Sequence, residues 1–465
     1  MMKRRIGNLG IAVILMAAML SACGGSKSGD SSPSASAPAA GGSSSPGSSP
    51  SSPSPSAAEE QVTLKVYHWY DDKIEKFDQV FAEFTKQHPN IKIESVVGVL
   101  NDANETMKKI DLAAASGEDI DVMILNSPTN YAQRAALGLL EPLNDYLSED
   151  GVNYEAEYVS DTSIDGKYYA LPGKLNQYFV LLNKDDLDKA NLPVPKQWTW
   201  DEYLDYAKKL THGEGAQKHY GTYFHTWVDY SILPLMGQPE NNNVVKSDGT
   251  PNVDNELFRQ GFAIRDRAKK DGSAVPYEDT ISQKLNYRNV YMNGQASMIE
   301  IGSWMIPEAA GNGPIKQTFK TAFAPYPTAK AGDPIASKTD GDFWAVYSKS
   351  KHKEAAYTFI KWMTSDGLAL QGKYLTASKK IDVGQTIDTL TAGPDAEKLI
   401  DKESLKYVLS VTKPAKLYIS VPYQGELDKA ITDEMEKMLL GNEDLDTAVK
   451  NAQQRVKDLI AANKQ

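Results

Sequence analysis

Residues 62–94 read VTLKVYHWYDDKIEKFDQVFAEFTKQHPNIKIE, and this stretch predicts the fold class. Side chains of alternating polarity from Val62 to Trp69 indicate a strand, and apolar residues across 77–84 then recur at helical spacing. Asp71-Asp72 is suited to begin that helix, and His88-Pro89-Asn90 ends it before a second short strand. A strand, a helix and another strand in succession are typical of a parallel sheet covered by helices.

The same alternation continues along the chain. We expect a helix at 104–115, a buried strand at 121–125 and a further helix at 129–137. Thr199-Trp200-Asp201-Glu202 forms a capping box, a pairing of polar residues that begins a helix, and two more amphipathic helices close the chain. The sequence therefore predicts an α/β protein with helices on both faces of a parallel sheet.

The first residues of the chain indicate export from the cytoplasm. Three basic residues at 3–5 precede an apolar run, 11–20, which has the length of a signal-peptide core and is too short to span a bilayer. Leu20-Ser21-Ala22-Cys23 follows and resembles the bacterial lipobox, in which the chain is cut before the cysteine and the sulfur receives a diacylglycerol. We therefore predict a lipoprotein signal peptide at 1–22 and lipidation of Cys23, with an ordinary signal peptide and an incidental cysteine as the alternative.

A low-complexity segment follows the predicted cleavage site. From Gly24 to Ala58 the chain is almost entirely Ser, Gly, Pro and Ala, so it has too little apolar surface to bury a core. We predict that residues 23–60, which begin with the lipidated cysteine, form a disordered tether. A long tether favours a Gram-positive cell surface, with the protein anchored on the extracytoplasmic face of the cell membrane.

Composition argues against several classes of function. The 465-residue chain has a formal charge of −11 and no basic cluster, which argues against nucleic-acid binding. Cys23 is the single cysteine, so after lipidation no thiol remains for a disulfide or a thiolate metal site. The six histidines lack metal-ligand spacing, and we expect neither a metal nor a cofactor. The 24 tyrosines and 7 tryptophans make the chain rich in aromatic rings, which matters for the ligand.

Several blocks of sequence occur in an order that resembles a known family. The blocks are Phe84–Ile91, Gly117–Val122, Leu137–Leu143, Asp165–Pro172, Leu182–Asp185, Trp198–Glu202, Asn293–Met298, Gly302–Trp304 and Ser348–Ile360. Together they resemble extracellular solute-binding protein family 1, the sugar-binding family of ABC importers that includes maltodextrin-binding protein. The resemblance covers nearly everything from Val62 to Ile460.

The resemblance implies a periplasmic-binding-protein-like fold. In this fold two α/β lobes enclose a ligand cleft, and the chain crosses between them at a hinge. Crossings are then expected near 171–175, 322–326 and 363–370. Lobe one would comprise 61–172 and 325–365, and lobe two would comprise 173–322 and 366–465.

The resemblance also implies a function. The protein would be a monomer without catalytic activity that captures a mono- or oligosaccharide outside the cell and delivers it to the permease subunits of an ABC importer. Three alternatives are a non-sugar solute in the same fold, a sensor partner of a membrane kinase, and a secreted glycoside hydrolase. A hydrolase needs two carboxylates across the scissile bond, and the sequence holds no Gly-x-Ser-x-Gly, His-Glu-x-x-His or phosphate-loop motif.

Candidate ligand residues follow from the chemistry of a sugar. Its C–H faces stack on aromatic rings, and its hydroxyls bond amides or carboxylates. In open α/β sheets ligands lie at the carboxyl ends of strands. This rule selects Trp69, Tyr70 and Asp71 after the first strand, with core packing as the alternative for Trp69. It also selects Asn126 and Ser127 after the third strand.

The resemblance adds candidates in the hinge, in an aromatic loop of lobe two and near the C-terminus. Trp304 matches the family's Gly-x-Trp residue, which stacks on sugar, and Asn176 aligns with a sugar-binding carboxylate. Asp342 lies where the family commonly has glycines that let a ligand approach the backbone. The other candidates are Tyr178, Trp227, Tyr230, Glu300, Trp344 and Tyr423, with packing as the alternative for several of them.

Overall fold

The computed structural model describes residues 61–393 and 395–463, which all belong to one compact unit of the chain. The predicted signal peptide, Cys23 and the predicted tether at 23–60 lie outside the described residues. Within the described part, no helix is both long enough and apolar enough to cross a membrane.

The central feature of the fold is one mixed β-sheet. The strands of the described part are β1 (Val62–His68), β2 (Ile91–Val97), β3 (Val122–Leu125), β4 (Leu171–Asn183), β5 (Tyr220–Tyr223), β6 (Ala296–Gly302), β7 (Thr321–Pro325), β8 (Ala336–Ser337), β9 (Thr339–Val346) and β10 (Lys413–Pro414). The main sheet has the order β2-β1-β3-β9-β4-β6-β5, and β7 pairs with β4 off this path. β1 pairs in parallel with β2 and β3, as the sequence predicts, whereas β9 runs antiparallel to both β3 and β4.

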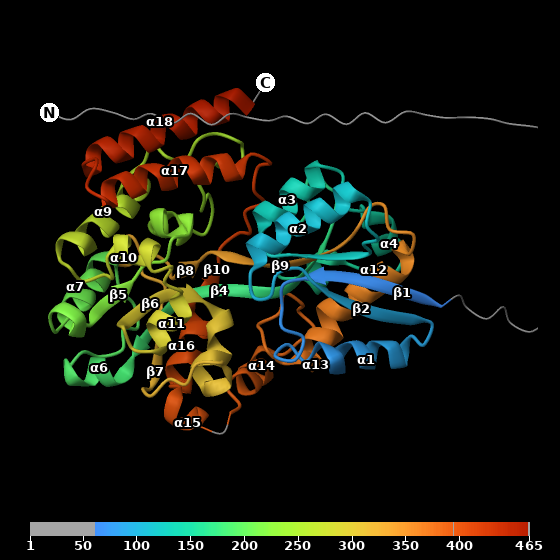
Figure 1. Ribbon diagram of the computed structural model, residues 1–465, viewed down its shortest axis with the longest axis horizontal. Helices are drawn as coiled ribbons and strands as arrows, with labels where there is room; N and C mark the ends of the chain where they lie inside the picture. Colours follow the sequence, from blue (N-terminus) through green and yellow to red (C-terminus); the bar gives the residue numbers. More distant parts are fainter. Residues whose placement is uncertain (1–60, 394, 464–465) are drawn as a thin grey trace, which may run out of the picture. The chain divides into compact units, whose positions relative to one another are not determined.

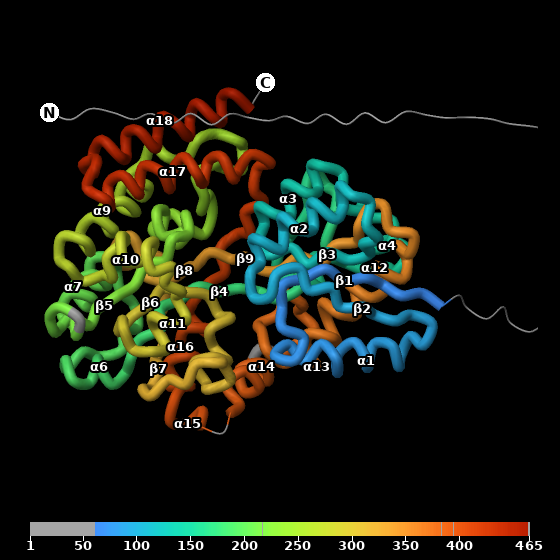
Figure 2. Tube along the Cα trace, in the orientation of Figure 1, coloured from blue at the N-terminus to red at the C-terminus, as the bar shows by residue number. Residues whose placement is uncertain are grey.

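Helices cover both faces of the sheet. They are α1 (Phe77–Gln87), α2 (Ala103–Ser116), α3 (Pro128–Ala136), α4 (Asn144–Glu149), α5 (Tyr154–Glu157), α6 (Lys184–Lys189), α7 (Trp200–Leu210), α8 (Leu233–Met236), α9 (Glu256–Lys270), α10 (Tyr277–Ser282), α11 (Tyr287–Met292), α12 (Lys353–Trp362), α13 (Leu368–Gln371), α14 (Val383–Leu390), α15 (Ala396–Leu399), α16 (Lys402–Val411), α17 (Gln424–Leu439) and α18 (Leu445–Asn463). In Figure 1, α2 and α3 lie on one side of β1 and β2, and α1 lies on the other. Figure 2 shows the two C-terminal helices, α17 and α18, packed together beside α9.

Local signals in the sequence set several helix starts correctly. Thr199 accepts a hydrogen bond from the Glu202 N–H, and the Glu202 carboxylate accepts one from the Thr199 N–H, so the predicted capping box of α7 is confirmed. Ser127 caps α3 in the same way by accepting from the Asn130 N–H. Each of these contacts satisfies backbone donors that have no partner within the helix.

The predicted start of α1 is wrong. Asp71 does not cap this helix but a separate turn, in which its carboxylate accepts from the N–H groups of Lys73 and Ile74. Lys76 then adopts a left-handed conformation with φ of 57°, and α1 begins only at Phe77. A left-handed backbone conformation is uncommon at a non-glycine residue, and the spacing of apolar residues in the sequence does not predict it.

β4 is the strand that belongs to both halves of the fold (Figure 1). Its residues 171–177 pair with β9, whereas residues 178–183 pair with β6 and β7. In the second half of the strand, Val180 and Leu182 enter one apolar cluster, and Phe179 and Leu181 enter another on the opposite face.

Separate apolar cores lie on either side of the β4–β9 pair. Side chains of β1, β3 and β9 pack against α1, α2 and α12 in the first core. The second half of β4 is covered by α7, α9, α17 and α18 on one face and by α11 and α16 on the other. Separate cores of this kind are what two lobes require.

The second crossing between the cores lies later in the chain than the expected 322–326. Tyr326 is still buried with α7 and α9, and the Thr328 N–H donates to the Trp198 carbonyl at 2.9 Å. The strand that reaches the first core, β9, begins at Thr339. The exact limits of the two lobes stay a prediction.

Gly341→Ala tests the β4–β9 pairing. A Cβ atom at position 341 would lie 2.0 Å from the Lys174 carbonyl oxygen, so the two strands would have to separate. We expect a loss of about 2–3 kcal/mol in the free energy of unfolding, measured by denaturant titration. Gly425→Ala in α17 is the control, because its Cβ would come no closer than 3.6 Å to any atom, and it should be neutral or stabilising. Equal effects of the two substitutions would contradict the close approach of the strands.

Candidate functional site

The β4–β9 pair carries a row of polar side chains at the centre of the candidate site. Asn176 and Asp340 lie opposite each other on the two strands, and the Asn176 amide donates to Asp340 Oδ1 at 2.8 Å. The Tyr178 hydroxyl donates to Asp340 Oδ2, also at 2.8 Å. Asp340 therefore ties two positions of β4 to β9, and all three side chains are buried.

Lys338 continues this row towards the second core. Its ammonium lies 3.0 Å from both carboxylate oxygens of Asp229 and 3.2 Å from Asp340 Oδ2. The same ammonium lies 5.5 Å from the centre of the Tyr178 ring. Burial alone would lower the pKa of Lys338, but the carboxylates of Asp229 and Asp340 raise that pKa above its usual value, so the side chain stays charged.

Glu300 is the least satisfied carboxyl near the row. It is 1% exposed, and its Oε1 has no hydrogen-bond partner among the described residues. Burial, with the charges of Asp229 and Asp340, raises the pKa of Glu300 well above its usual range. Tyr230 is buried beside it and donates its hydroxyl to the Glu300 backbone carbonyl at 2.7 Å.

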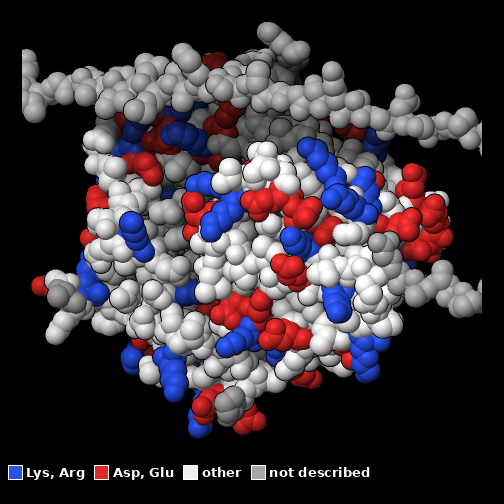
Figure 3. Space-filling model, turned by 45° about the vertical axis from the view of Figure 1, so that its right-hand side comes forward, with Lys and Arg blue, Asp and Glu red and all other residues white. Residues whose placement is uncertain are grey.

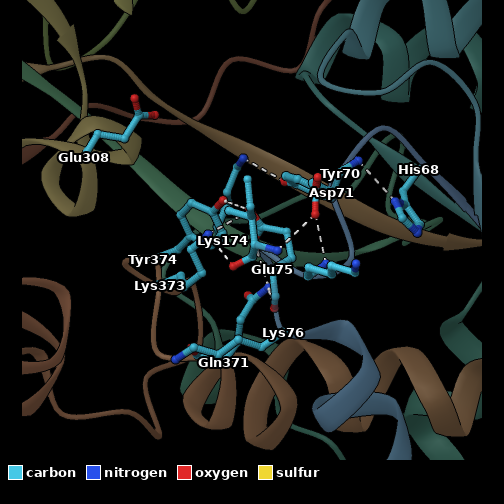
Figure 4. A network of polar contacts seen from close by, with 12 residues as sticks. His68, Tyr70, Asp71, Glu75, Lys76, Lys174, Glu308, Gln371, Lys373 and Tyr374 are labelled. Atoms are coloured by element: carbon cyan, nitrogen blue, oxygen red, sulfur yellow. Dashed lines mark hydrogen bonds and ion pairs between the residues drawn. The ribbon is translucent and has the colours of Figure 1, made fainter. Parts of the chain in front are cut away.

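At the other end of the row, Lys174 lies in a cage of three aromatic rings. Its ammonium is 5.9, 5.1 and 4.8 Å from the ring centres of Trp69, Tyr70 and Tyr374, and Figure 4 shows it beside the two tyrosines. The ammonium donates to the Tyr70 hydroxyl at 2.8 Å and lies 3.1 Å from Asp342 Oδ2. Tyr70 also donates to Asp342. Lys174 thereby joins the loop after β1 to both strands of the hinge.

Glu75 connects this cage to the segment after α13. Its carboxylate accepts from the Tyr374 hydroxyl at 2.9 Å, from the Gln371 amide at 3.0 Å and from the Lys373 ammonium at 3.1 Å. In Figure 4 these groups converge on Glu75, whereas Glu308 from the second lobe lies apart from them. These bonds hold the segment 371–374 against the turn before α1.

His68 holds the loop that carries Trp69 and Tyr70. It is fully buried, and its Nδ1 accepts the Tyr70 N–H at 3.1 Å, so the proton of the neutral ring is on Nε2. Nε2 lies 2.7 Å from Ser95 Oγ, which donates to the Asp72 carboxylate at 2.8 Å. This arrangement requires a neutral ring, and burial lowers the pKa of His68 to about 4.

The second lobe supplies an aromatic surface. The Trp304 ring is half-buried, 5.5 Å from the Tyr178 ring and 6.2 Å from the Trp227 ring, with its N–H donating to the Tyr287 hydroxyl at 3.2 Å. The Arg288 guanidinium stacks 4.7 Å from the centre of the Tyr287 ring. Because Trp304 and Trp227 both keep exposed area, their rings are available to the C–H faces of a ligand.

A cavity of about 70 Å³ opens beside Lys338. The hydroxyls of Thr129 in α3 and Ser420 before α17 lie 2.9 Å apart, so segments from both lobes bound this cavity. Typical ligand pockets measure roughly 300–1,000 Å³, and a sugar can enter only if these segments move apart. Polar residues on the lining are Ser127, Thr129, Asp229, Asn242, Asn243, Lys338, Thr339, Tyr418, Ser420, Gln424 and Asp428.

The structure brings most of the sequence-predicted residues together around the hinge. Tyr70, Asp342 and Trp344 line one small cavity together with Lys174. Six more predicted residues belong to the polar row or lie beside it: Asn176, Tyr178, Trp227, Tyr230, Glu300 and Trp304. Their role as ligand contacts stays a prediction.

Three predicted residues lie apart from this group. Asp71 is engaged in the turn before α1. Asn126 precedes the cavity residue Ser127, but its own side chain bonds neighbouring asparagines at 2.7 and 3.2 Å. Tyr423 is half-buried immediately before the cavity residue Gln424. Two of the three thus identify the right segment of chain without lining the cavity themselves.

Sequence reasoning missed Lys174, Asp229, Lys338, Gln424 and Asp428. One signal was present, because the charged residues Lys338, Asp340 and Asp342 occur at every second position at the start of β9, and such spacing places them on one face of a strand. Asp229 offers no signal of this kind, since its contact with Lys338 joins residues 109 positions apart.

Two serine–histidine–aspartate clusters invite comparison with catalytic triads. In the cluster of His219, Ser297 and Asp186, the same ring nitrogen lies 2.6 Å from the serine and 3.3 Å from the carboxylate. His68 likewise presents one nitrogen to both of its partners. A nucleophilic triad needs the serine and the carboxylate on opposite ring nitrogens, so neither cluster has that arrangement.

The described residues give little support for a metal site or a nucleic-acid-binding surface. Across 61–393 and 395–463, no group of three or more His, Cys, Asp or Glu side chains could hold a metal ion. On the face drawn in Figure 3, Lys and Arg side chains are interspersed with Asp and Glu. A nucleic-acid surface would instead gather positive charge.

The sequence profile of the bacterial extracellular solute-binding protein family matches residues 79–381, which is more than half of the chain. The multiple sugar-binding protein of Streptococcus mutans is 22% identical over 376 residues, covering 78% of this chain and 79% of that protein. The maltodextrin-binding protein MdxE of Bacillus subtilis is 23% identical over 317 residues, covering 67% of this chain and 71% of that protein.

Solved structures share the same architecture. An ABC substrate-binding protein of Listeria monocytogenes in complex with cycloalternan is 20% identical, with a TM-score of 0.71 over 86% of this chain and 100% of that one. The sugar-binding protein MalE of Xanthomonas citri is 19% identical, with a TM-score of 0.65 over 86% of this chain and 98% of that one. The two-lobed α/β fold expected from the sequence is thereby confirmed.

The buried His68 should make stability depend on pH. The unfolded chain binds a proton at His68 below about pH 6.5, whereas the folded ring stays neutral down to about pH 4. The unfolded state therefore binds more protons in this window, and stability falls as the pH falls. From pH 7 to pH 4, the advantage of the wild type over His68→Gln in free energy of unfolding should shrink by about 3 kcal/mol.

Denaturant titrations at several pH values measure this difference. His88→Gln is the control for replacing an imidazole at a partly exposed position of the same lobe. A gap between wild type and His68→Gln that stays constant from pH 7 to pH 4 would contradict the assignment of a buried neutral ring.

Proposed function

The chain belongs to the bacterial extracellular solute-binding protein family, and we propose that it is the carbohydrate-binding subunit of an ABC importer. It captures a mono- or oligosaccharide outside the cell and delivers it to the permease subunits. The polar row on the β4–β9 pair carries this proposal, because Tyr178 joins it to the rings of Trp304 and Trp227 and Lys338 joins it to a cavity of amides and carboxylates. Rings for C–H faces beside amides and carboxylates for hydroxyls suit the two surfaces of a sugar.

Related proteins support the same ligand class. Those compared above carry the names multiple sugar-binding protein and maltodextrin-binding protein, and their family is one of binding proteins rather than enzymes. We accordingly assign no catalytic step and no cofactor to this chain. Its ligand is bound, carried and released unchanged.

Ligand binding is coupled to closure of the lobes. A sugar needs more room than the cavity of about 70 Å³ offers, so the segments bearing Thr129 and Ser420 must separate before it enters. Rings of lobe two and polar groups of the hinge would then hold the sugar together only in the closed form. The ligand therefore favours closure in proportion to its extra affinity for that form, and the permease would recognise the closed shape.

Membrane attachment belongs to the same proposal. The Cys23 sulfur carries a diacylglycerol, and residues 23–60 connect it to the binding domain on the extracytoplasmic face of a Gram-positive cell membrane. One acyl chain binds a membrane only marginally, whereas two chains hold firmly. The protein acts as a monomer.

Cys23→Ser tests the anchor, because serine cannot form the thioether. Cells given labelled palmitate should incorporate label into the wild type and not into Cys23→Ser, and the variant should leave the membrane fraction. Ser26→Ala, three residues further on, is the control and should label normally. Label in Cys23→Ser equal to that in the wild type would rule out this anchor.

Trp304→Ala tests the sugar site. A thermal-shift screen of the full chain against a glycan panel identifies a ligand, since binding raises stability by RT ln(1 + [L]/Kd). Loss of the ring should lower affinity for that ligand about tenfold to hundredfold, measured by calorimetry. Trp362→Ala is the control, because this half-buried tryptophan lies on α12 and bonds Gln87 outside the site. Unchanged affinity in Trp304→Ala would remove Trp304 from the site.

A further inference from the structure

We infer that the cavity beside Lys338 selects sugars that offer hydrogen-bond donors, either uncharged or amine-bearing, and rejects sugars that carry a carboxylate or phosphate. The inference rests on the proposed function, because it assigns a ligand class to the same cleft. It follows from which polar atoms of the lining already have partners and which do not.

Lys338 is the cation of the cavity lining within the described residues, and its donors are already engaged. An ammonium has three donors, and this one faces three carboxylate oxygens: both of Asp229 at 3.0 Å and one of Asp340 at 3.2 Å. An anionic ligand could bond Lys338 only by displacing one of these carboxylates. The displaced carboxylate would then lose its charge partner in a largely buried site, which is strongly unfavourable.

Several neutral donors of the lining are engaged as well. The Asn242 amide donates to the Lys416 carbonyl at 2.9 Å. The Gln424 amide donates to Asp428 Oδ1 at 2.8 Å, and the Tyr418 hydroxyl donates to Gln424 Oε1 at 3.3 Å. The Asn243 amide donates to none of the described residues, so the lining offers a ligand acceptor a neutral amide but no free cation.

The acceptors of the cavity remain available. Asp428 accepts one hydrogen bond, from Gln424, and forms no ion pair within the described part of the chain. Burial raises the pKa of the Asp428 carboxyl to about 6, and an O–H or N–H of a ligand would stabilise its ionised form. An ammonium would add attraction to Asp428 and Asp229, whereas a carboxylate or phosphate would add repulsion.

Matched sets of sugars test this ranking on the full chain. Glucose, glucosamine and glucuronic acid form one set, and galactose, galactosamine and galacturonic acid form another. Calorimetry at pH 7 should give at least tenfold weaker binding for the uronic acid than for the neutral or amino sugar of the same set. A uronic acid that binds as tightly as its neutral counterpart would overturn the inference while supporting the proposed function. Binding of no sugar, in these sets or in the glycan panel, would overturn both.

Asp428→Asn tests whether this carboxylate causes the preference for amino sugars over uronic acids. The amide keeps the shape of the side chain and removes the charge, so the ratio of amino-sugar to uronic-acid affinity should fall about tenfold. Asp458→Asn is the control, because Asp458 is exposed on α18 and outside the cavity lining, and its ratio should match the wild type. An unchanged ratio in a folded Asp428→Asn protein, verified by its melting temperature, would remove Asp428 from the selection.

Discussion

The carboxylate of Asp340 holds together the two strands on which the rest of the structure depends. It accepts from Asn176 and Tyr178 of β4 and pairs with Lys338 just before β9. A buried carboxylate is tolerated there because its charge is paired and its oxygens are bonded. Since β4 continues from this pairing into β6 and β7, the strand pair that Asp340 ties is also the connection between the two cores.

The same strand pair explains where the functional surface lies. Its charges are matched along the row, Lys174 with Asp342 at one end and Lys338 with Asp229 at the other. A row with its own counter-charges can face a ligand that is itself uncharged. Because these groups are fixed on strands, and the β1 loop beside them is fixed by His68, ordering them on binding costs little conformational entropy.

Short-range signals in the sequence predicted the elements but not the contacts that make the site. The helix expected at 104–115 is observed at Ala103–Ser116, and the capping box at Thr199 lies as expected, because both depend on neighbours within one or two turns. The exchange of partners along β4 and the ion pair between Asp229 and Lys338 could not be predicted in this way, since they join distant parts of the chain. The aromatic candidates, with Glu300 and Asp342, were found through the chemistry of a sugar and the family resemblance. The charged residues Lys174, Asp229, Lys338 and Asp428 were missed.

The central claim is that a sugar is held over the β4–β9 pair, between rings of the second lobe and polar groups of the hinge. A crystal structure of the protein with a sugar identified by screening tests it most directly. We expect electron density for the sugar against the Trp304 ring, with its hydroxyls bonded to residues that line the hinge and the cavity beside Lys338. Well-defined sugar density elsewhere on the molecule, with no sugar contacting either strand of the pair, would contradict this account.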